Sequence, residues 1–223
     1  MEYAIEVAQA CHEQGIKTVA VTAGYINAAP RADFFTHMDA ANIDLKGLSD
    51  AFYRRLCAGR LQPVLDTLQY VKEETGTWLE ITNLVIPDHN DSIAELDALT
   101  KWVVNVLGTD VPLHFSAFHP DFKMRDVPRT SPETLVEARR IALENGVRYV
   151  YTGNVRDEQG ESTYCHVCGA LLIARDWYAI GDWELTADGA CPECGTPCSG
   201  YFDRQPGDWG ARRQPVRLAS FVA

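Results

Sequence analysis

The stretch Trp78-Leu-Glu-Ile-Thr-Asn-Leu-Val-Ile86 predicts a β-strand, because apolar and β-branched residues dominate it and Pro87 closes it. Ser92-Ile-Ala-Glu95 then forms a capping box that opens a helix, which Gly108 ends. A second apolar strand is expected over residues 111–118. A strand, a helix and a strand in this order predict a parallel pair joined by a right-handed crossover.

The same alternation extends to both sides of this unit. Helical spacing of apolar residues, capping residues and glycine stops favour helices, and short apolar runs favour strands. The sequence predicts a helix over 1–14, strands over 17–22 and 42–46, a helical region over 50–74, a helix over 130–145 and a strand over 148–152. We therefore expect an α/β domain over residues 1–155 with a parallel sheet, either open or barrel-like.

Two cysteine turns dominate the region after residue 155. Cys165-His-Val-Cys168 and Cys191-Pro-Glu-Cys194 are each followed by a glycine and are separated by 22 residues. The spacer lets both sulfurs of one turn reach the same ion, so the pattern predicts one tetrahedral four-thiolate site. Zinc is the first choice, iron or an iron–sulfur cluster uses the same ligands, and the alternatives are disulfides or free thiols. Residues 156–200 form this small zinc-ribbon-like module, and residues 201–223 form an irregular tail.

Composition narrows the classes of partner. The 223 residues carry a formal net charge of −11, which argues against nucleic acid as a partner. The sequence contains neither an apolar run of the ~18–20 residues that span a bilayer nor a charged and then apolar leader. We expect a cytoplasmic protein without a membrane partner, in which the cysteines stay reduced.

Polar side chains gather where the predicted strands end, which is where parallel α/β proteins place their chemistry. The candidates are Thr22, Gly24, Asp44, Lys46 and His119. An Asp and a Lys within an apolar strand must pair or bind a ligand to offset desolvation, so a plain salt bridge is the alternative reading. A single histidine at a strand end is often a structural donor. Cys11 and Cys57 are isolated and are expected to be small core residues.

Several segments together resemble radical S-adenosylmethionine (SAM) enzymes. They are Val21-Thr-Ala-Gly-Tyr25, Asn42-Ile-Asp-Leu-Lys-Gly47, Glu80-Ile-Thr-Asn-Leu-Val-Ile-Pro87, His114-Phe-Ser-Ala-Phe-His-Pro120 and Val150-Tyr-Thr-Gly-Asn154, followed by the two cysteine turns. The chain is most similar to the AmmeMemoRadiSam system radical SAM protein, itself similar to pyruvate formate-lyase-activating enzymes.

The resemblance implies a six-stranded partial TIM barrel, of which this chain carries the later strands. It implies that Asp44, Lys46 and His119 contact SAM, a small-molecule partner, and that the turn at Thr22 and Gly24 belongs to the same site. A protein would be the substrate by analogy with activating enzymes. Val21 stands where those enzymes place an Asp near a monovalent cation, which puts that cation site in doubt.

A family-defining element is missing from the sequence. The Cys-x-x-x-Cys-x-x-Cys loop that binds a 4Fe–4S cluster in these enzymes does not occur in the 223 residues. The chain also starts within a helical pattern. We therefore expect a fragment of a longer enzyme that generates a 5′-deoxyadenosyl radical, with the cluster ligands upstream and the isolated chain inactive.

Two other functions remain open from the residues. One is a non-catalytic module in which the cysteine turns dock a partner protein. The other is a metal-dependent hydrolase that uses His114, His119 and Asp91, although these residues lack a regular ligand spacing.

Overall fold

Five parallel strands form a sheet whose spatial order, β1-β2-β3-β4-β5, is also their order along the chain. Each new strand is therefore added on the same side of the last, and right-handed crossovers then bring every connecting helix to one face. The strands are β1 (Val19–Thr22), β2 (Ala40–Asp44), β3 (Trp78–Val85), β4 (Leu113–Ala117) and β5 (Val150–Gly153).

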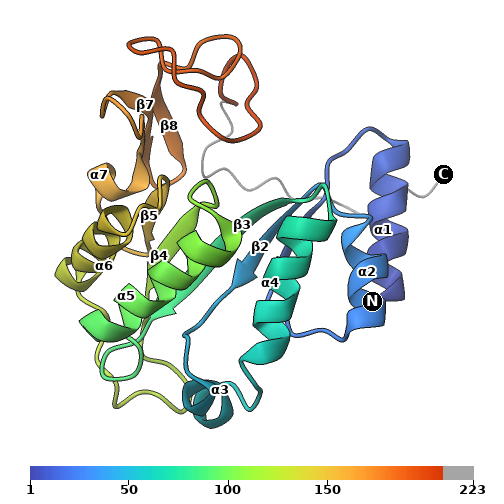
Figure 1. Cartoon of the computed structure of the whole chain (residues 1–223), viewed down its shortest axis with the longest axis vertical. Coiled ribbons are helices and arrows are strands. Elements are labelled where there is room, and N and C mark those ends of the chain that lie inside the picture. The colour runs from blue at the N-terminus through green and yellow to red at the C-terminus, as the bar shows by residue number, and fades with distance from the viewer. Residues whose placement is uncertain (208–223) are drawn as a thin grey trace, which may run out of the picture. The chain divides into compact units, whose positions relative to one another are not determined.

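The helices follow from this winding. In this computed structural model α4, α5 and α6 lie side by side over one face of the sheet, and α2 contacts α4 (Figure 1). The helices of this part of the chain are α1 (Glu2–Glu13), α2 (Ala28–Phe35), α3 (Asp50–Leu56), α4 (Gln62–Glu74), α5 (Ile93–Trp102), the π-helix η1 (Val103–Leu107) and α6 (Pro132–Glu144).

The two faces of the sheet differ in chemistry. Alternate residues of each strand, such as Ile43, Ile81 and Phe115, are fully buried in the core beneath the helices. The residues between them, such as Asn42 and Glu80, are only half-buried and mostly polar. A singly wound parallel sheet with a polar, open inner face is the arrangement of a partial barrel, which confirms the predicted α/β class.

The structure describes residues 1–207, which divide at residue 160 into two compact units, Met1–Gly160 and the residues from Glu161 onward. The short helix α7 (Glu158–Glu161) spans that division. The second unit contains an antiparallel sheet of β6 (Thr163–Tyr164), β7 (Leu171–Asp176) and β8 (Ala179–Trp183). The expected irregular tail, 201–223, lies outside the described residues from 208 onward.

Three expectations about local structure were wrong. The helical region 50–74 is two helices, because the chain turns at Ala58 with a φ of +51°. Helix α2 was not anticipated, and α5 passes into a π-helical turn before Gly108. The predicted strand 42–46 begins at Ala40 and ends at Asp44, so Lys46 lies beyond it.

Capping follows the predicted pattern at the start of α5. Ser92 accepts a hydrogen bond from the Glu95 N–H, as the capping box predicts. At α6 the cap is Ser131, whose hydroxyl accepts from the Thr134 N–H, with Pro132 at the first helical position. Thr130 is buried, where its hydroxyl donates to the Val85 carbonyl and accepts from the Phe118 N–H. It thereby ties together the ends of β3 and β4.

Candidate functional sites

Asp44 and Lys46 lie at the carboxyl edge of the sheet and pair with each other. Lys46 Nζ donates to Asp44 Oδ2 at 2.8 Å, and the two side chains are 31% and 28% exposed. A partly exposed pair of this kind contributes at most about 1 kcal/mol, so stability alone gives little reason for it. The salt bridge that was the plain alternative does form, and it opens onto a cavity.

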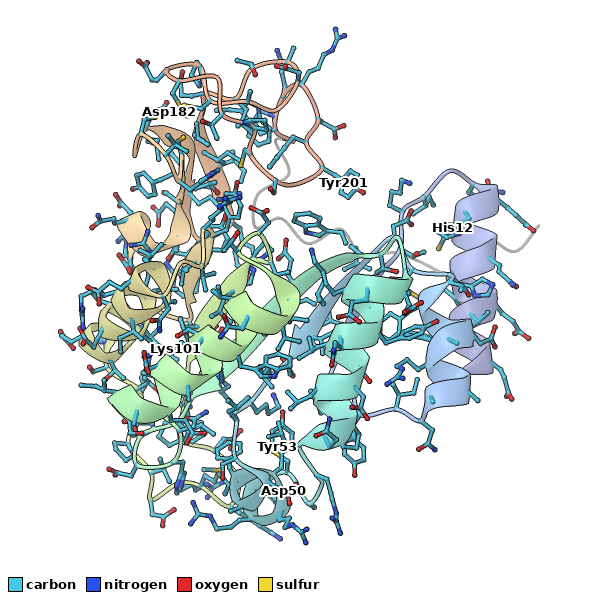
Figure 2. The ribbon with its side chains drawn as sticks, in the orientation of Figure 1. His12, Asp50, Tyr53, Lys101, Asp182 and Tyr201 are labelled. Atoms are coloured by element: carbon cyan, nitrogen blue, oxygen red, sulfur yellow. The ribbon has the colours of Figure 1, made fainter. Side chains whose placement is uncertain are left out.

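This cavity measures about 210 Å³ and lies beside the end of β2. Aromatic and small apolar side chains form most of its wall, and the ion pair is its charged feature. Tyr53 reaches it from α3, on the side of that helix toward the sheet (Figure 2). The lining residues are Ala23, Tyr25, Asp44, Lys46, Tyr53, Cys57, Ala58, Gly59 and Val64.

Two titratable side chains of the wall are neutral at pH 7. Burial raises the pKa of Tyr53 to about 12, and partial desolvation at the cavity wall raises the pKa of the Cys57 thiol. Cys57 was expected in the core, but it is an exposed residue at the cavity wall. The charge within the cavity therefore comes from Asp44 and Lys46.

The other predicted cofactor residues, Thr22, Gly24 and His119, do not line the cavity. Thr22 ends β1, and its hydroxyl oxygen accepts from the Gly24 N–H at 3.2 Å. Gly24 has a φ of +65°, and a Cβ there would lie 2.7 Å from the Ile43 side chain, so the turn requires glycine. His119 is exposed two residues beyond β4 and is not among the lining residues.

A second polar cluster crosses the open face of the sheet, and sequence reasoning did not pair its members. Glu80 on β3 accepts from His114 Nε2 on β4 at 2.8 Å and from Trp78 Nε1 at 3.0 Å. His114 also stacks on Tyr151 of β5. In the strand register Tyr151 lies directly opposite His114, and Glu80 is its diagonal neighbour on β3.

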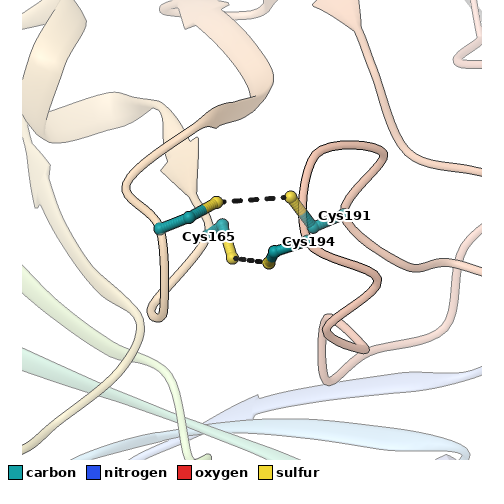
Figure 3. Close-up of side chains that lie close together, drawn as sticks. Cys165, Cys191 and Cys194 are labelled. Carbon is teal, nitrogen blue, oxygen red and sulfur yellow. Dashed lines mark hydrogen bonds between the residues drawn. The ribbon is translucent and has the colours of Figure 1, made fainter.

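The four predicted cysteine ligands come together in the second unit. Sγ of Cys165 lies 3.5 Å from Sγ of Cys194, Sγ of Cys168 lies 3.6 Å from Sγ of Cys191, and all four lie within 4.8 Å of one another (Figure 3). A disulfide would bring two sulfurs to about 2.05 Å. Four sulfurs at ~2.3 Å from one central ion would lie ~3.8 Å apart, so the group fits one tetrahedral metal ion.

Two matching turns build this site. In one, the Gly169 N–H donates to the Cys165 carbonyl at 2.9 Å, and in the other the Gly195 N–H donates to the Cys191 carbonyl at the same distance. Both glycines have φ near +75°, at +77° and +73°, which L-residues rarely adopt. The glycine after each cysteine pair is thus explained by backbone geometry.

The surroundings favour the thiolate form that binds metal at Cys194 but not at Cys168, where desolvation and the neighbouring thiols raise the pKa to about 12. The Thr196 hydroxyl and N–H lower the pKa of Cys194 to about 6. Cys198 is buried nearby in sequence but does not belong to the group of four.

Among residues 1–207 the four cysteines are the only cluster of three or more candidate metal ligands. His114 is held by Glu80 and Tyr151, and Asp91 accepts from the Asp88 N–H in a turn. The hydrolase site of His114, His119 and Asp91 is therefore not assembled. None of the helices in this described part combines the length and apolar character that a membrane span requires.

Comparison with known proteins agrees with the fold. No family model matches the chain. An uncharacterized protein of Methanocaldococcus jannaschii is 46% identical over 174 residues, which are 78% of this chain and 51% of that protein. A pyruvate formate-lyase-activating enzyme of Clostridium pasteurianum is 25% identical over 153 residues, 64% of this chain and 61% of the enzyme. The chain thus spans about half to three fifths of these relatives.

Two solved structures share its architecture. A domain of pyruvate-formate lyase-activating enzyme from Bacteroides vulgatus superposes with a TM-score of 0.61 at 16% identity, covering 69% of this chain and 91% of that one. A radical SAM methyltransferase from Sphaerobacter thermophilus gives 0.50 at 17% identity, covering 71% and 46%. The chain therefore has the fold of radical SAM proteins, is similar in sequence to an activating enzyme, and carries a four-cysteine metal-binding site.

Proposed function

We propose that this chain is the later part of a radical SAM enzyme and that the Asp44–Lys46 cavity binds SAM. The observation that carries the proposal is the ion pair itself, which lies in a cavity at the carboxyl edge of a parallel sheet. Ligands of parallel α/β proteins bind at that edge. The similarity to an activating enzyme supports the choice of ligand.

The two charged groups suit the polar half of SAM. The Asp44 carboxylate can accept hydrogen bonds from hydroxyl or amino groups, and the Lys46 ammonium can pair with a carboxylate. In this structure Asp44 and Lys46 pair with each other at 2.8 Å. A ligand that offers both a hydrogen-bond donor and a carboxylate can separate them without leaving either charge unpaired. Both residues bind and orient, and neither transfers a proton. Thr22, Gly24 and His119 complete the proposed SAM contacts.

The chain's own cysteines do not provide the radical cluster. Its seven cysteines include no Cys-x-x-x-Cys-x-x-Cys sequence. We propose that residues outside this chain would hold a 4Fe–4S cluster. When reduced, the cluster would supply one electron to SAM, whose sulfur–C5′ bond would then break to give methionine and a 5′-deoxyadenosyl radical.

The β1 edge of the sheet supports the proposal that further strands belong to the enzyme. Within residues 1–207, β1 pairs on one side only, with β2, and its side chains Val19 and Val21 are 62% and 80% exposed. An apolar strand with unpaired backbone groups is a site for further pairing. We propose that additional strands of the same enzyme pair there in the working protein.

The four-cysteine site is proposed to hold zinc in a structural role. Four protein thiolates fill the coordination sphere, which leaves no open position for a substrate. The thiolates also require a reducing compartment, so we place the enzyme in the cytoplasm.

Product analysis tests the proposal. SAM, a strong reductant and iron with sulfide are added anaerobically to this 223-residue chain and to the same chain extended by its upstream coding sequence. We expect 5′-deoxyadenosine from the extended protein and none from the isolated chain above a no-protein control. In the extended protein Asp44→Ala should weaken SAM binding while the iron content stays unchanged.

Product from the isolated chain would refute the fragment proposal. An extended protein that binds its cluster but never cleaves SAM would refute the enzymatic one.

A second candidate function is a docking module built on the four-cysteine unit. The tip of its β7–β8 hairpin presents Trp177 and Tyr178, which are 53% and 68% exposed. Exposed aromatic side chains of this kind are common in protein interfaces. A chain that holds one zinc ion but has no affinity for SAM would favour this function.

A further inference from the structure

The backbone that carries Lys46 is held by side chains and not by the sheet. Strand pairing between β2 and β3 ends at Asp44 and Thr82, followed by one further hydrogen bond from the Leu45 N–H to the Thr82 carbonyl. Lys46 lies beyond this point, so its position depends on other contacts.

Buried side chains from α3 and β3 form hydrogen bonds with the backbone of Leu45 and Lys46. The Lys46 N–H donates to the Tyr53 hydroxyl at 3.1 Å, and Asn83 Nδ2 donates to the Leu45 carbonyl at 2.7 Å. Tyr53 is 4% exposed and Asn83 is 1% exposed. Bonds between buried groups are shielded from water and hold their geometry.

The Asn90 side chain also bonds to the Lys46 backbone. Its Nδ2 donates to the Lys46 carbonyl at 2.6 Å and to the Leu84 carbonyl at 2.9 Å, and its Oδ1 accepts from the Ile86 N–H at 2.6 Å. The side chain is 2% exposed, so its polar atoms have no access to water as an alternative. One carboxamide thus fixes the Lys46 peptide to the end of β3.

The next two residues are confined as well. The Leu48 N–H donates to Glu95 Oε1 at 3.2 Å. A Cβ on Gly47 would lie 3.2 Å from that same oxygen and 3.3 Å from the Phe52 ring. The turn after Lys46 therefore has little room to move.

We propose that Asn90 is a positioning residue, which acts through the Lys46 peptide to hold the Lys46 ammonium beside Asp44 in the cavity. This inference rests on the proposed function for its ligand, SAM. Tyr53 and Asn83 act in the same way on the two groups next to that peptide. A ligand that recognises the Asp44–Lys46 pair depends on this hold, since a displacement of about 1 Å at a binding group is costly.

The test compares Asn90→Ala with a matched control, Thr77→Val. Thr77 is also buried, and its hydroxyl contacts the Phe35 and Met38 carbonyls at 3.0 Å, but it precedes β3 at the opposite end of the sheet. Both variants lose buried side-chain bonds to two carbonyls, and Asn90→Ala also loses the bond from the Ile86 N–H. A merely structural role would therefore affect both proteins alike.

Two measurements are made on the whole chain. Calorimetric titration with SAM should show a dissociation constant raised roughly tenfold or more in Asn90→Ala and unchanged in Thr77→Val. Acylation of Lys46 by an N-hydroxysuccinimide ester, read by peptide mass spectrometry against Lys101, should rise several-fold in Asn90→Ala alone. Lys101 is a suitable reference because it pairs with Asp97 on the exposed side of α5.

The outcomes separate this inference from the proposed function. If the wild-type chain binds no SAM, the proposed site fails, and the acylation rates still decide the role of Asn90. The positioning role of Asn90 would be overturned by equal Lys46 acylation in the wild type, Asn90→Ala and Thr77→Val. It would also be overturned if Asn90→Ala kept the wild-type affinity for SAM. If Asn90→Ala does not fold, Tyr53→Phe takes its place, because it removes only the hydroxyl that accepts from Lys46.

Discussion

The sheet unit, Met1–Gly160, encloses a continuous apolar core between its strands and helices, whereas the described residues from Glu161 onward bury few apolar side chains. In that second unit Leu172, Ile173 and Leu185 are the larger ones, and Cys165 and Cys191 are buried beside them. A core of this size does not stabilise a small unit without a further link. The comparison indicates that apolar burial stabilises the first unit, and it predicts that a metal ion held by the four cysteines stabilises the second.

Removing the metal should have the largest effect and should be confined to one unit. A structural zinc site supplies about 10–16 kcal/mol of apparent binding free energy, which is folding free energy for a small module. Cys165→Ser, or a strong chelator, should raise amide exchange throughout residues 161–207 and leave β1–β5 protected. Hydrogen-exchange mass spectrometry measures both units in one sample.

Cys198→Ser is the matched control, because that thiol lies outside the group of four. Equal loss of protection in Cys198→Ser, or loss across the sheet after metal removal, would contradict the division.

The reverse experiment deletes core volume from the first unit. Phe115 on β4 is fully buried, and Phe115→Ala should lower the free energy of unfolding by ~3–5 kcal/mol. Denaturant unfolding followed by exchange in each unit should show the sheet weakened and the four-cysteine unit still protected. If both units lose protection together, they unfold as one and the comparison fails.

A smaller effect is expected from a polar link between α1 and the sheet. Hydrogen bonds from Lys17, the Thr18 N–H and His12 hold the pKa of Asp39 well below its usual range. Asp39→Asn should therefore cost about 1 kcal/mol at neutral pH.

The sign of the pH dependence follows from this lowered pKa. Stabilisation by Asp39 is complete above its unfolded pKa of about 3.9 and is lost as the pH falls through the folded value. The difference between wild type and Asp39→Asn should then shrink below about pH 4 in denaturant titrations. A difference that stays constant down to strongly acidic pH would exclude this origin.

Regular patterns made the framework predictable from the sequence. The strands and the capping box at Ser92 carry local signals, and paired cysteines with trailing glycines specify their own geometry. Helix α2 carries no such signal, since the side chain of its cap residue Asn27 makes no capping bond. The break at Ala58 and the π-turn of η1 depend on how neighbouring elements pack.

The cavity was less predictable than the pair within it. Asp44 and Lys46 stand out as charges in a predicted apolar strand. Tyr25, which follows β1, and Cys57, which ends α3, are brought to the cavity only by the tertiary structure. Asn90 lies in the turn after β3, beside Asp91, and only the tertiary structure brings its carboxamide to Lys46.

Photolabelling tests the central claim, that SAM binds at the Asp44–Lys46 cavity, most directly. The chain is irradiated with radiolabelled SAM, with and without excess unlabelled SAM, and the labelled peptides are identified by mass spectrometry. We predict saturable label on the peptides that contain residues 23–25, 44–46 and 53–59, and its loss in Asp44→Ala. Saturable label in the four-cysteine unit, or label that persists unchanged in Asp44→Ala, would contradict the account.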